Sequence, residues 1–356
     1  MIHYIVSVLT EGAIFAIMAL GLNVIWGWAG DFDLAFYGYV ALGAYMTMVL
    51  TIGAPMPPVQ YILGFHLPYL VGLLGGIVAA MIMGLIVGLI ALRHLREIYF
   101  AIVTLGAVYV LYVLAGHYTP FVDGFNGLSG LLDPMGKFLG LTYQSYQPFF
   151  LGFCLLICIL VFLLVERMSG SQFGMALRTI REDERAAAAF GRDIYRMKLR
   201  AYVLGAGLGG LAGGLFAAYL TAFNPSAWTP IETIVLYAAV FVGGRGNNRG
   251  VVVGVLLVNV LFQEATRFLP AVPGHADYAP AIREIVIGAV IVLFLRFRPQ
   301  GIFPERRLID RDPAARRGGK LLRSARGLVG TRGPTPAPPL GSDGDVVAVT
   351  GEGKAG

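Results

Sequence analysis

The stretch PYLVGLLGGIVAAMIMGLIVGLIAL, residues 68–92, decides the fold class of this chain. It contains no charged residue and is longer than the ~20 apolar residues that cross a hydrocarbon core about 30 Å thick. Lipid offers no water to bond with backbone amides and carbonyls, so a spanning segment of this kind must satisfy them within a helix. The stretch also lacks the alternation of a barrel strand. We therefore predict a transmembrane α-helix here.

The same composition runs through most of the chain. Of 356 residues, 57% are hydrophobic and 13% are charged, and the mean hydropathy is +0.72, whereas soluble domains carry about a quarter of charged residues. We predict an all-α polytopic membrane protein with about nine transmembrane helices, in a range of about eight to ten. The expected spans are residues 2–26, 32–52, 68–92, 98–116, 148–165, 201–222, 232–243, 250–268 and 281–297.

Lysine and arginine in the loops predict the orientation, because cytoplasmic loops carry an excess of both. The loop at 166–200 holds eight basic residues, whereas the loops at 223–231 and 269–280 hold none. We therefore expect the first loop in the cytoplasm and the other two outside. Alternation of the spans then places the N-terminus outside and the C-terminus in the cytoplasm.

A change of composition at residue 305 divides the chain into two predicted regions. Residues 1–304 form the expected membrane domain, and residues 305–356 are rich in arginine, proline and glycine. Such a segment cannot bury enough apolar surface to offset its ordering entropy, so we expect a disordered cytoplasmic tail. Its basic residues either attract anionic lipid, at about 1 kcal/mol each, or serve only as a topology signal in a solvated tail.

Small residues recur every four positions in two expected spans. Since lipid tails are as apolar as leucine, membrane helices associate by close backbone approach, which small residues permit. We predict packing seams there, with a pore lining as the alternative. The residues are Gly72, Gly76, Ala80, Gly84 and Gly88 in one span, and Gly205, Gly209 and Gly213 in the other.

Two glycine-rich polar stretches interrupt apolar runs, WGWAGDFD at 26–33 and GGRGNNRG at 243–250. Discontinuous helices in transporters free backbone groups for a substrate or for gating. An ordinary tight turn explains each stretch equally well. The candidate path or gate residues at these breaks are Gly27, Gly30, Gly243 and Gly244.

Residues suited to covalent or metal chemistry are scattered along the sequence. The histidines show no ligand spacing, so no metal site is expected. Cys154 and Cys158 lie one helical turn apart in an apolar run, which favours small buried hydrophobic residues over a redox pair. We identify no catalytic residue, and a membrane enzyme is the poorest of the function classes considered.

The sequence shows no motif that would supply energy for moving a solute across the membrane. The expected spans hold few charges, and Glu264 and Arg267 are spaced to neutralise each other, so no proton relay is apparent. The nearest stretch to a phosphate-binding loop, GEGKAG, lacks the Ser or Thr after Lys354. Any ATP would therefore be bound and hydrolysed by partner subunits.

A charged, alanine-rich stretch, REDERAAAAFG at 181–191, lies within the arginine-rich loop. We predict a cytoplasmic helix whose small face, formed by Ala186, Ala187 and Ala189, is flanked by charge. A surface of this kind can seat in a groove of another protein. A solvated connector is the other interpretation.

Several independent motifs together show which known family the chain resembles from residue 1 to about 304. It resembles the LivM-type permease subunits of ABC importers for branched-chain amino acids. The motifs that carry the resemblance are YFAIVTLG (99–106), GFNGLSG (124–130), GMALRTIREDERAAAAFG (174–191), VGGRGNNRGVVVG (242–254) and RFRPQGIF (296–303).

The resemblance implies a multi-pass permease of the bacterial inner membrane, surrounded by lipid, with a coupling loop at 166–200. Its implied partners are a LivH-like permease, two ABC ATPase subunits and a periplasmic solute-binding protein. It implies no cofactor in this chain and no nucleic-acid partner. The implied solutes are branched-chain or other apolar amino acids, with urea, short amides or aromatic acids as alternatives.

The resemblance also implies roles for individual residues. ATPase closure would push on the helix around Ala186 and Ala187, and Gly191 would let the chain turn back. Docking contacts with the ATPase would come from Arg178, Arg181 and Glu184. The motif matches give Thr104, Asn126 and Gly127 as residues of the path or external gate.

Two departures from the family pattern leave questions open. Importers generally carry Glu before the paired alanines, whereas this chain has Arg185, with the acid one place earlier at Glu184. Asp31 and Asp33 stand where apolar, Ser or His residues are expected, which indicates either a different solute or a solvated turn. The competing class is a stand-alone secondary transporter or channel, which would work without ATP.

Overall fold

The computed structural model describes residues 2–53, 64–94, 97–131, 134–136, 140, 143–258, 285, 288–289, 296–297 and 301–305. The described residues belong to one compact unit that extends to Glu305. The predicted tail beyond Glu305 lies outside the described residues.

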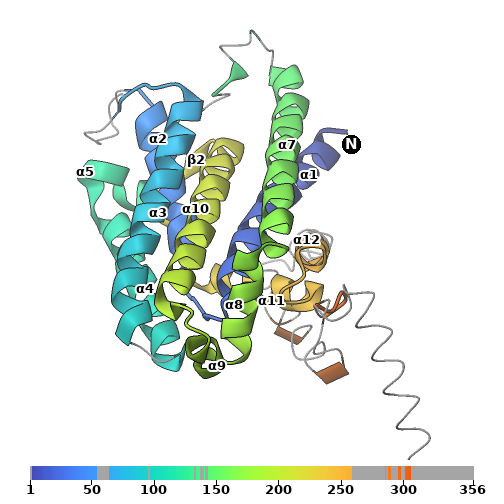
Figure 1. Cartoon of the computed structure of the whole chain (residues 1–356). Coiled ribbons are helices and arrows are strands. Elements are labelled where there is room, and N and C mark those ends of the chain that lie inside the picture. Colours follow the sequence, from blue (N-terminus) through green and yellow to red (C-terminus); the bar gives the residue numbers. More distant parts are fainter. Residues whose placement is uncertain are drawn as a thin grey trace, which may run out of the picture. The chain divides into compact units, whose positions relative to one another are not determined.

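The described part is a bundle of helices with one minimal strand pair (Figure 1). Strands β1 (Leu128–Ser129) and β2 (Ala222–Phe223) pair antiparallel, with Leu128 opposite Phe223. The helices are α1 (Ile2–Leu22), the π-helix η1 (Asn23–Trp28), α2 (Phe36–Thr51), α3 (Tyr69–His94), α4 (Glu97–His117), α5 (Thr119–Val122), the 3-10 turn η2 (Gly124–Asn126), α7 (Tyr143–Ser169), α8 (Gln172–Glu182), α9 (Glu184–Ala189), α10 (Ile194–Leu220), the 3-10 turn η3 (Pro225–Ala227), α11 (Ile231–Gly243) and α12 (Asn248–Val255).

Six helices within the described residues are long and apolar enough to cross a membrane. Their bounds are His3–Trp28, Tyr69–Arg93, Ile98–His117, Ser145–Ser169, Ile194–Leu220 and Pro225–Gly243. Two further apolar helices are shorter, Phe36–Thr51 and Asn248–Val258. These eight correspond in order to the first eight expected spans. The ninth, at 281–297, lies almost entirely outside the described residues.

Burial separates a central layer from a peripheral one. Of the most apolar 18 residues in each span, 67% are buried in the span formed by α1 and η1 and 61% in α10. The corresponding shares are 17% in α4 and 22% in α7. Most of α2 is buried as well. The exposed faces of α3, α4 and α7 are largely aliphatic, as is expected for helices that face lipid or another membrane subunit.

Glycine allows the central helices to approach closely. A side chain at Gly213 would collide with the carbonyl of Val40 in α2, and one at Gly43 would collide with the backbone of Gly210. On the other side of α10, a side chain at Gly84 would meet Ala206. The predicted packing seams are therefore confirmed, and they join α10 to both α2 and α3.

Candidate functional site

The charged stretch forms two short helices rather than the single helix that its sequence suggested. Helix α8 ends at Glu182, and Asp183 adopts an extended conformation, with φ −155° and ψ 102°. The Asp183 carboxylate then accepts hydrogen bonds from the amides of Arg185 (2.9 Å) and Ala186 (3.0 Å). Asp183 is thus the N-cap of α9. Both helices lie at the end of the bundle away from the N-terminus (Figure 1).

The alanines of α9 do not all face outwards. Ala187 is only 1% exposed and packs into the protein itself. Ala188 and Ala189 are exposed, and Phe190 is 82% exposed. The free apolar surface of this segment is therefore formed by residues 188–190 and not by the expected face that included Ala187.

Gly191 ends the segment in a conformation that suits glycine. Its φ is +74°, in the left-handed region, and its amide donates to the carbonyl of Ala188 at 2.9 Å. Apart from its chain neighbours, no described residue has an atom within 4 Å of the position that a Cβ atom would take at Gly191. Backbone conformation, rather than close packing, is thus what requires glycine here.

The two arginines of α8 are bound within the protein. Arg178 Nε lies 2.9 Å from Glu305 Oε1, and Arg181 Nη2 lies 2.5 Å from Glu305 Oε2. Arg181 also donates through Nη1 to the carbonyl oxygen of Gly27. The side chains of Arg178 and Arg181 are only 11% and 15% exposed. They brace α8 against the first helix break and the segment 301–305.

The two glycine-rich breaks lie in direct contact, although they are more than 200 residues apart. Asn23 is fully buried; its Oδ1 accepts from the amide of Gly246 at 2.9 Å, and its Nδ2 donates to Asn248 Oδ1 at 3.0 Å. Arg245 lies 4.5 Å above the centre of the Trp26 ring and donates to the Trp26 carbonyl at 3.2 Å. The breaks therefore form one structure at the end that carries α8.

Close approach requires glycine at two positions of these breaks, and backbone conformation requires it at Gly30. A side chain at Gly27 would collide with Asn23, and Gly30 has φ +92° with Arg181 directly beside it. A side chain at Gly243 would collide with the carbonyl of Gly250.

Segment 301–305 covers the second break. Gly244 has φ +116° and packs against Gly301. The amides of Ile302 and Phe303 donate to the carbonyls of Val242 (2.9 Å) and Gly243 (3.1 Å). Ile302 and Phe303 are therefore bound to the end of α11.

Asp31 and Asp33 are buried, so the interpretation of a solvated turn is wrong. Asp31 is 5% exposed, and its Oδ1 lies 2.6 Å from Lys198 Nζ. Asp33 is fully buried, and its Oδ1 accepts from the amide of Ala35 at 2.9 Å. Tyr237 also binds both backbone polar groups of Asp33, at 2.8 and 2.9 Å. The two acids hold the turn at 29–35 in place.

Lys198 has a second carboxylate partner. Its Nζ lies 2.6 Å from Glu184 Oε1, at the start of α9. Glu184, expected as a docking contact, is thus engaged within the protein in this structure, although its side chain remains 50% exposed.

The remaining predicted path residues lie in two places. Thr104 is fully buried, and its hydroxyl accepts from the amide of Leu34 at 3.1 Å, next to the first break. Asn126 and Gly127 lie between α4 and β1. Gly127 has φ +73° and lies against Phe223 and Asn224. The structure therefore brings Thr104 to the breaks and leaves Asn126 and Gly127 beside the strand pair.

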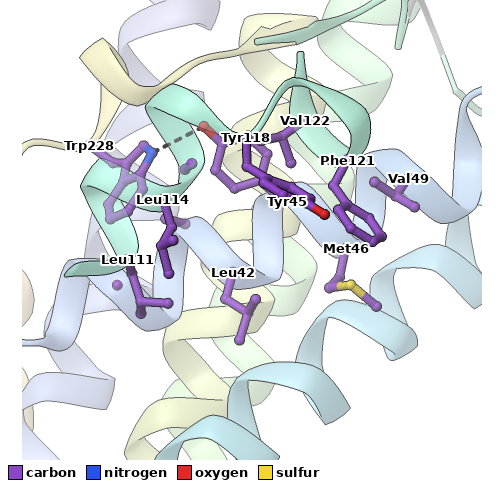
Figure 2. Close-up of a pocket in the computed structure, with 13 residues that line it drawn as sticks. Leu42, Tyr45, Met46, Val49, Leu111, Leu114, Tyr118, Phe121, Val122 and Trp228 are labelled. Carbon is purple, nitrogen blue, oxygen red and sulfur yellow. Dashed lines mark hydrogen bonds between the residues drawn. The ribbon is translucent and has the colours of Figure 1, made fainter. Parts of the chain in front are cut away.

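An apolar cavity of about 440 Å³ opens between α2, α4 and α5. Figure 2 shows Tyr45, Tyr118, Phe121 and Trp228 among the aromatic side chains that surround it. Trp228 Nε1 donates to the Tyr45 hydroxyl at 3.2 Å. Because burying an unpaired charge is costly, this lining suits an apolar group.

Sequence reasoning missed four residues that join the two helix breaks, α8 and α10: Asn23, Lys198, Asn248 and Glu305. Each is polar or charged at the edge of an apolar run, which is the only signal that the sequence offers for them. Within the described residues, no group of three His, Cys, Asp or Glu side chains is placed to hold a metal ion.

The fold and this site define a multi-pass helical membrane protein whose charged loop is bound to two helix breaks. A profile of the family described as branched-chain amino acid transport system/permease component matches residues 4–295. The chain belongs to this family. It is therefore a non-catalytic transmembrane component of an ABC transporter.

Similar proteins support this assignment. The chain is 32% identical over 321 residues to the high-affinity branched-chain amino acid transport system permease protein LivM of Escherichia coli K12, covering 84% of this chain and 70% of that protein. It is 28% identical over 222 residues to the probable LivM permease of Methanocaldococcus jannaschii, covering 60% and 62%. It is 22% identical over 305 residues to LivH of Escherichia coli K12, covering 82% and 92%. No solved structure matches the chain.

Proposed function

We propose that this chain is one permease half of an ATP-driven importer for branched-chain or other apolar amino acids. Its partners are a LivH-like permease, two ATPase subunits and an external solute-binding protein. It resides in the bacterial inner membrane with α8, α9 and the C-terminus in the cytoplasm. The similarity to LivM, together with the excess of basic residues in the loop 166–200, supports this assignment.

The observation that carries the proposal is the contact between α8 and the first helix break. Arg181 binds the Gly27 carbonyl and the Glu305 carboxylate together. An ATPase subunit that pushes on α8 and α9 would therefore move the first helix break and segment 301–305 with them. The proposed docking surface is the exposed part of α9 with Phe190, and Gly191 is the turn that returns the chain to α10.

The breaks at 26–33 and 243–250 supply the proposed gate. Gly27 lets the first break approach the amide of Gly246 in the second, and Gly30 lies against Arg181. Gly243 and Gly244 let the second break pack against Gly250 and Gly301. Thr104 holds the turn at 29–35. Asn126 and Gly127 are proposed as external gate residues on the motif match. The apolar cavity of Figure 2 supports a solute with an apolar side chain.

Reconstitution tests the proposal directly. The chain is co-purified with the proposed partner permease, ATPases and binding protein, and placed in proteoliposomes. We expect uptake of radiolabelled leucine only with the complete set and ATP, and none with ADP. Urea and benzoate, offered in parallel, identify a different solute class if they are taken up in preference to leucine. Uptake by this chain alone would contradict the proposal and favour a stand-alone transporter or channel.

A further inference from the structure

One ammonium group joins two elements that lie far apart in the sequence. Lys198, near the start of α10, places Nζ 2.6 Å from Asp31 Oδ1 and 2.6 Å from Glu184 Oε1. Asp31 belongs to the turn at 29–35, within the first helix break, and Glu184 is the first residue of α9. Lys198 is therefore the charge through which α9 contacts that turn.

The two ion pairs differ in their access to water. The side chains of Lys198 and Asp31 are 11% and 7% exposed, whereas that of Glu184 is 50% exposed. Separating the buried pair leaves uncompensated charge in a place with little solvent, which is strongly unfavourable. Releasing Glu184 exposes its carboxylate to water and leaves Lys198 still neutralised by Asp31, so that step is easy. The Lys198–Asp31 pair should therefore persist, whereas the Lys198–Glu184 pair can separate at little cost.

Three other basic side chains of this region, those of Arg178, Arg181 and Arg196, have different carboxylate partners. Arg178 and Arg181 both bind Glu305. Arg196 pairs with Asp193 on the surface, at 3.1 Å, with its side chain 75% exposed. Lys198 is thus the basic group that binds both Asp31 and Glu184.

We propose that Lys198 is a positioning residue that transmits movement of α9 to the helix break, with Asp31 as its permanent partner and Glu184 as its releasable partner. The inference rests on the proposed function, because it assumes that an ATPase moves α9. The carboxylates of Asp31 and Glu184 repel each other because they carry the same charge. A cation that reaches both is needed to hold their two elements together.

The test uses the complete complex in proteoliposomes and measures three quantities: assembled complex, ATP hydrolysis and leucine uptake per ATP hydrolysed. Lys198→Met keeps the aliphatic stem and removes the charge. Because Lys198→Met leaves the Asp31 carboxylate buried without this cation, we expect fewer complexes to assemble. The complexes that do assemble should hydrolyse ATP, while uptake per ATP hydrolysed falls about five- to hundredfold, the usual range of coupling between sites. Lys198→Arg restores most of the uptake. Arg196→Met, two residues away on the same helix, is the matched control and leaves all three quantities unchanged.

Further variants separate the two partners. Glu184→Gln lowers uptake per ATP without reducing assembly, because its pair is half-exposed. Asp31→Asn reduces assembly, because Lys198 is left buried without its permanent partner. The double variant Lys198→Met with Asp31→Asn removes both buried charges, so that the test can proceed even where the single variants assemble poorly, and we expect the same loss of uptake per ATP.

Two results would overturn the inference. One is normal uptake per ATP in Lys198→Met and in the double variant. The other is a double variant that assembles less but keeps normal ATP hydrolysis and normal uptake per assembled complex, which shows a structural role alone. A wild-type complex without ATP-driven uptake contradicts the proposed function instead, so the two failures are distinguishable.

Discussion

The guanidinium of Arg181 donates a hydrogen bond to the carbonyl oxygen of Gly27, which lies 154 residues earlier in the chain. The same guanidinium binds the carboxylate of Glu305. Its planar fork can satisfy both acceptors at once, which an ammonium group cannot do with the same geometry. One side chain therefore joins α8, the first helix break and segment 301–305.

Replacing Arg181 tests this junction. We expect Arg181→Met to lower the free energy of unfolding by about 1.5–3 kcal/mol, the usual contribution of hydrogen bonds that involve a charged group. Arg181→Lys should recover only part of the loss. Chemical denaturation in detergent micelles measures both. Arg185→Met, at an exposed position on α9, is the control and should remain near wild type; equal effects at the two positions would refute the structural role of Arg181.

Glycine packing between α2 and α10 makes a second prediction. A methyl group at Gly213 collides with the Val40 carbonyl, whereas among the described residues nothing beyond its own helix and chain neighbours lies within 4 Å of a methyl group at Gly152 in α7. Gly213→Ala should destabilise the protein by about 1–3 kcal/mol through overpacking. Gly152→Ala should be neutral or stabilise by up to about 1 kcal/mol, because alanine favours the helix. Thermal unfolding in detergent distinguishes them, and shifts of the same sign and size would contradict the observed approach of the helices.

Gly191 provides a test of the turn after α9. Its left-handed backbone disfavours most side chains by about 1–2 kcal/mol, while asparagine is tolerated there. We expect Gly191→Asn to keep ATP-driven uptake and Gly191→Trp to lose it, with membrane insertion intact in both. Uptake in proteoliposomes and the amount of protein in the membrane fraction measure these effects. Normal uptake in Gly191→Trp would remove Gly191 from the proposed coupling segment.

Phe190 tests where the partner docks. Its ring is 82% exposed, so Phe190→Asp removes little packing and should change the free energy of unfolding by less than about 0.5 kcal/mol. We expect this variant to lose co-purification with the ATPase subunits. Phe65→Asp changes another exposed phenylalanine, 56% exposed and just before α3, and should keep the ATPases bound. Retention of the ATPases by Phe190→Asp would exclude this docking surface.

The sequence by itself determined the class of structure. Hydropathy is a local property, since each membrane helix must satisfy its own backbone, and eight of the nine expected spans correspond to apolar helices in the described residues. The packing of α3 and α10 was also predictable from a local pattern, because a packing seam needs only a small residue at every fourth position along one helix. Motifs then indicated the family to which the chain belongs.

The tertiary structure alone decided how the polar residues are used. Asp31 finds Lys198 and Asn23 finds Asn248 across distances of 167 and 225 residues, and no local pattern specifies such a pair. Asp183 ended α8 early because its carboxylate caps the next helix, and burial turned Ala187 inwards while Phe190 stayed exposed. A hydrogen bond or ion pair depends on two positions at once, so its partner becomes known only when the chain is folded.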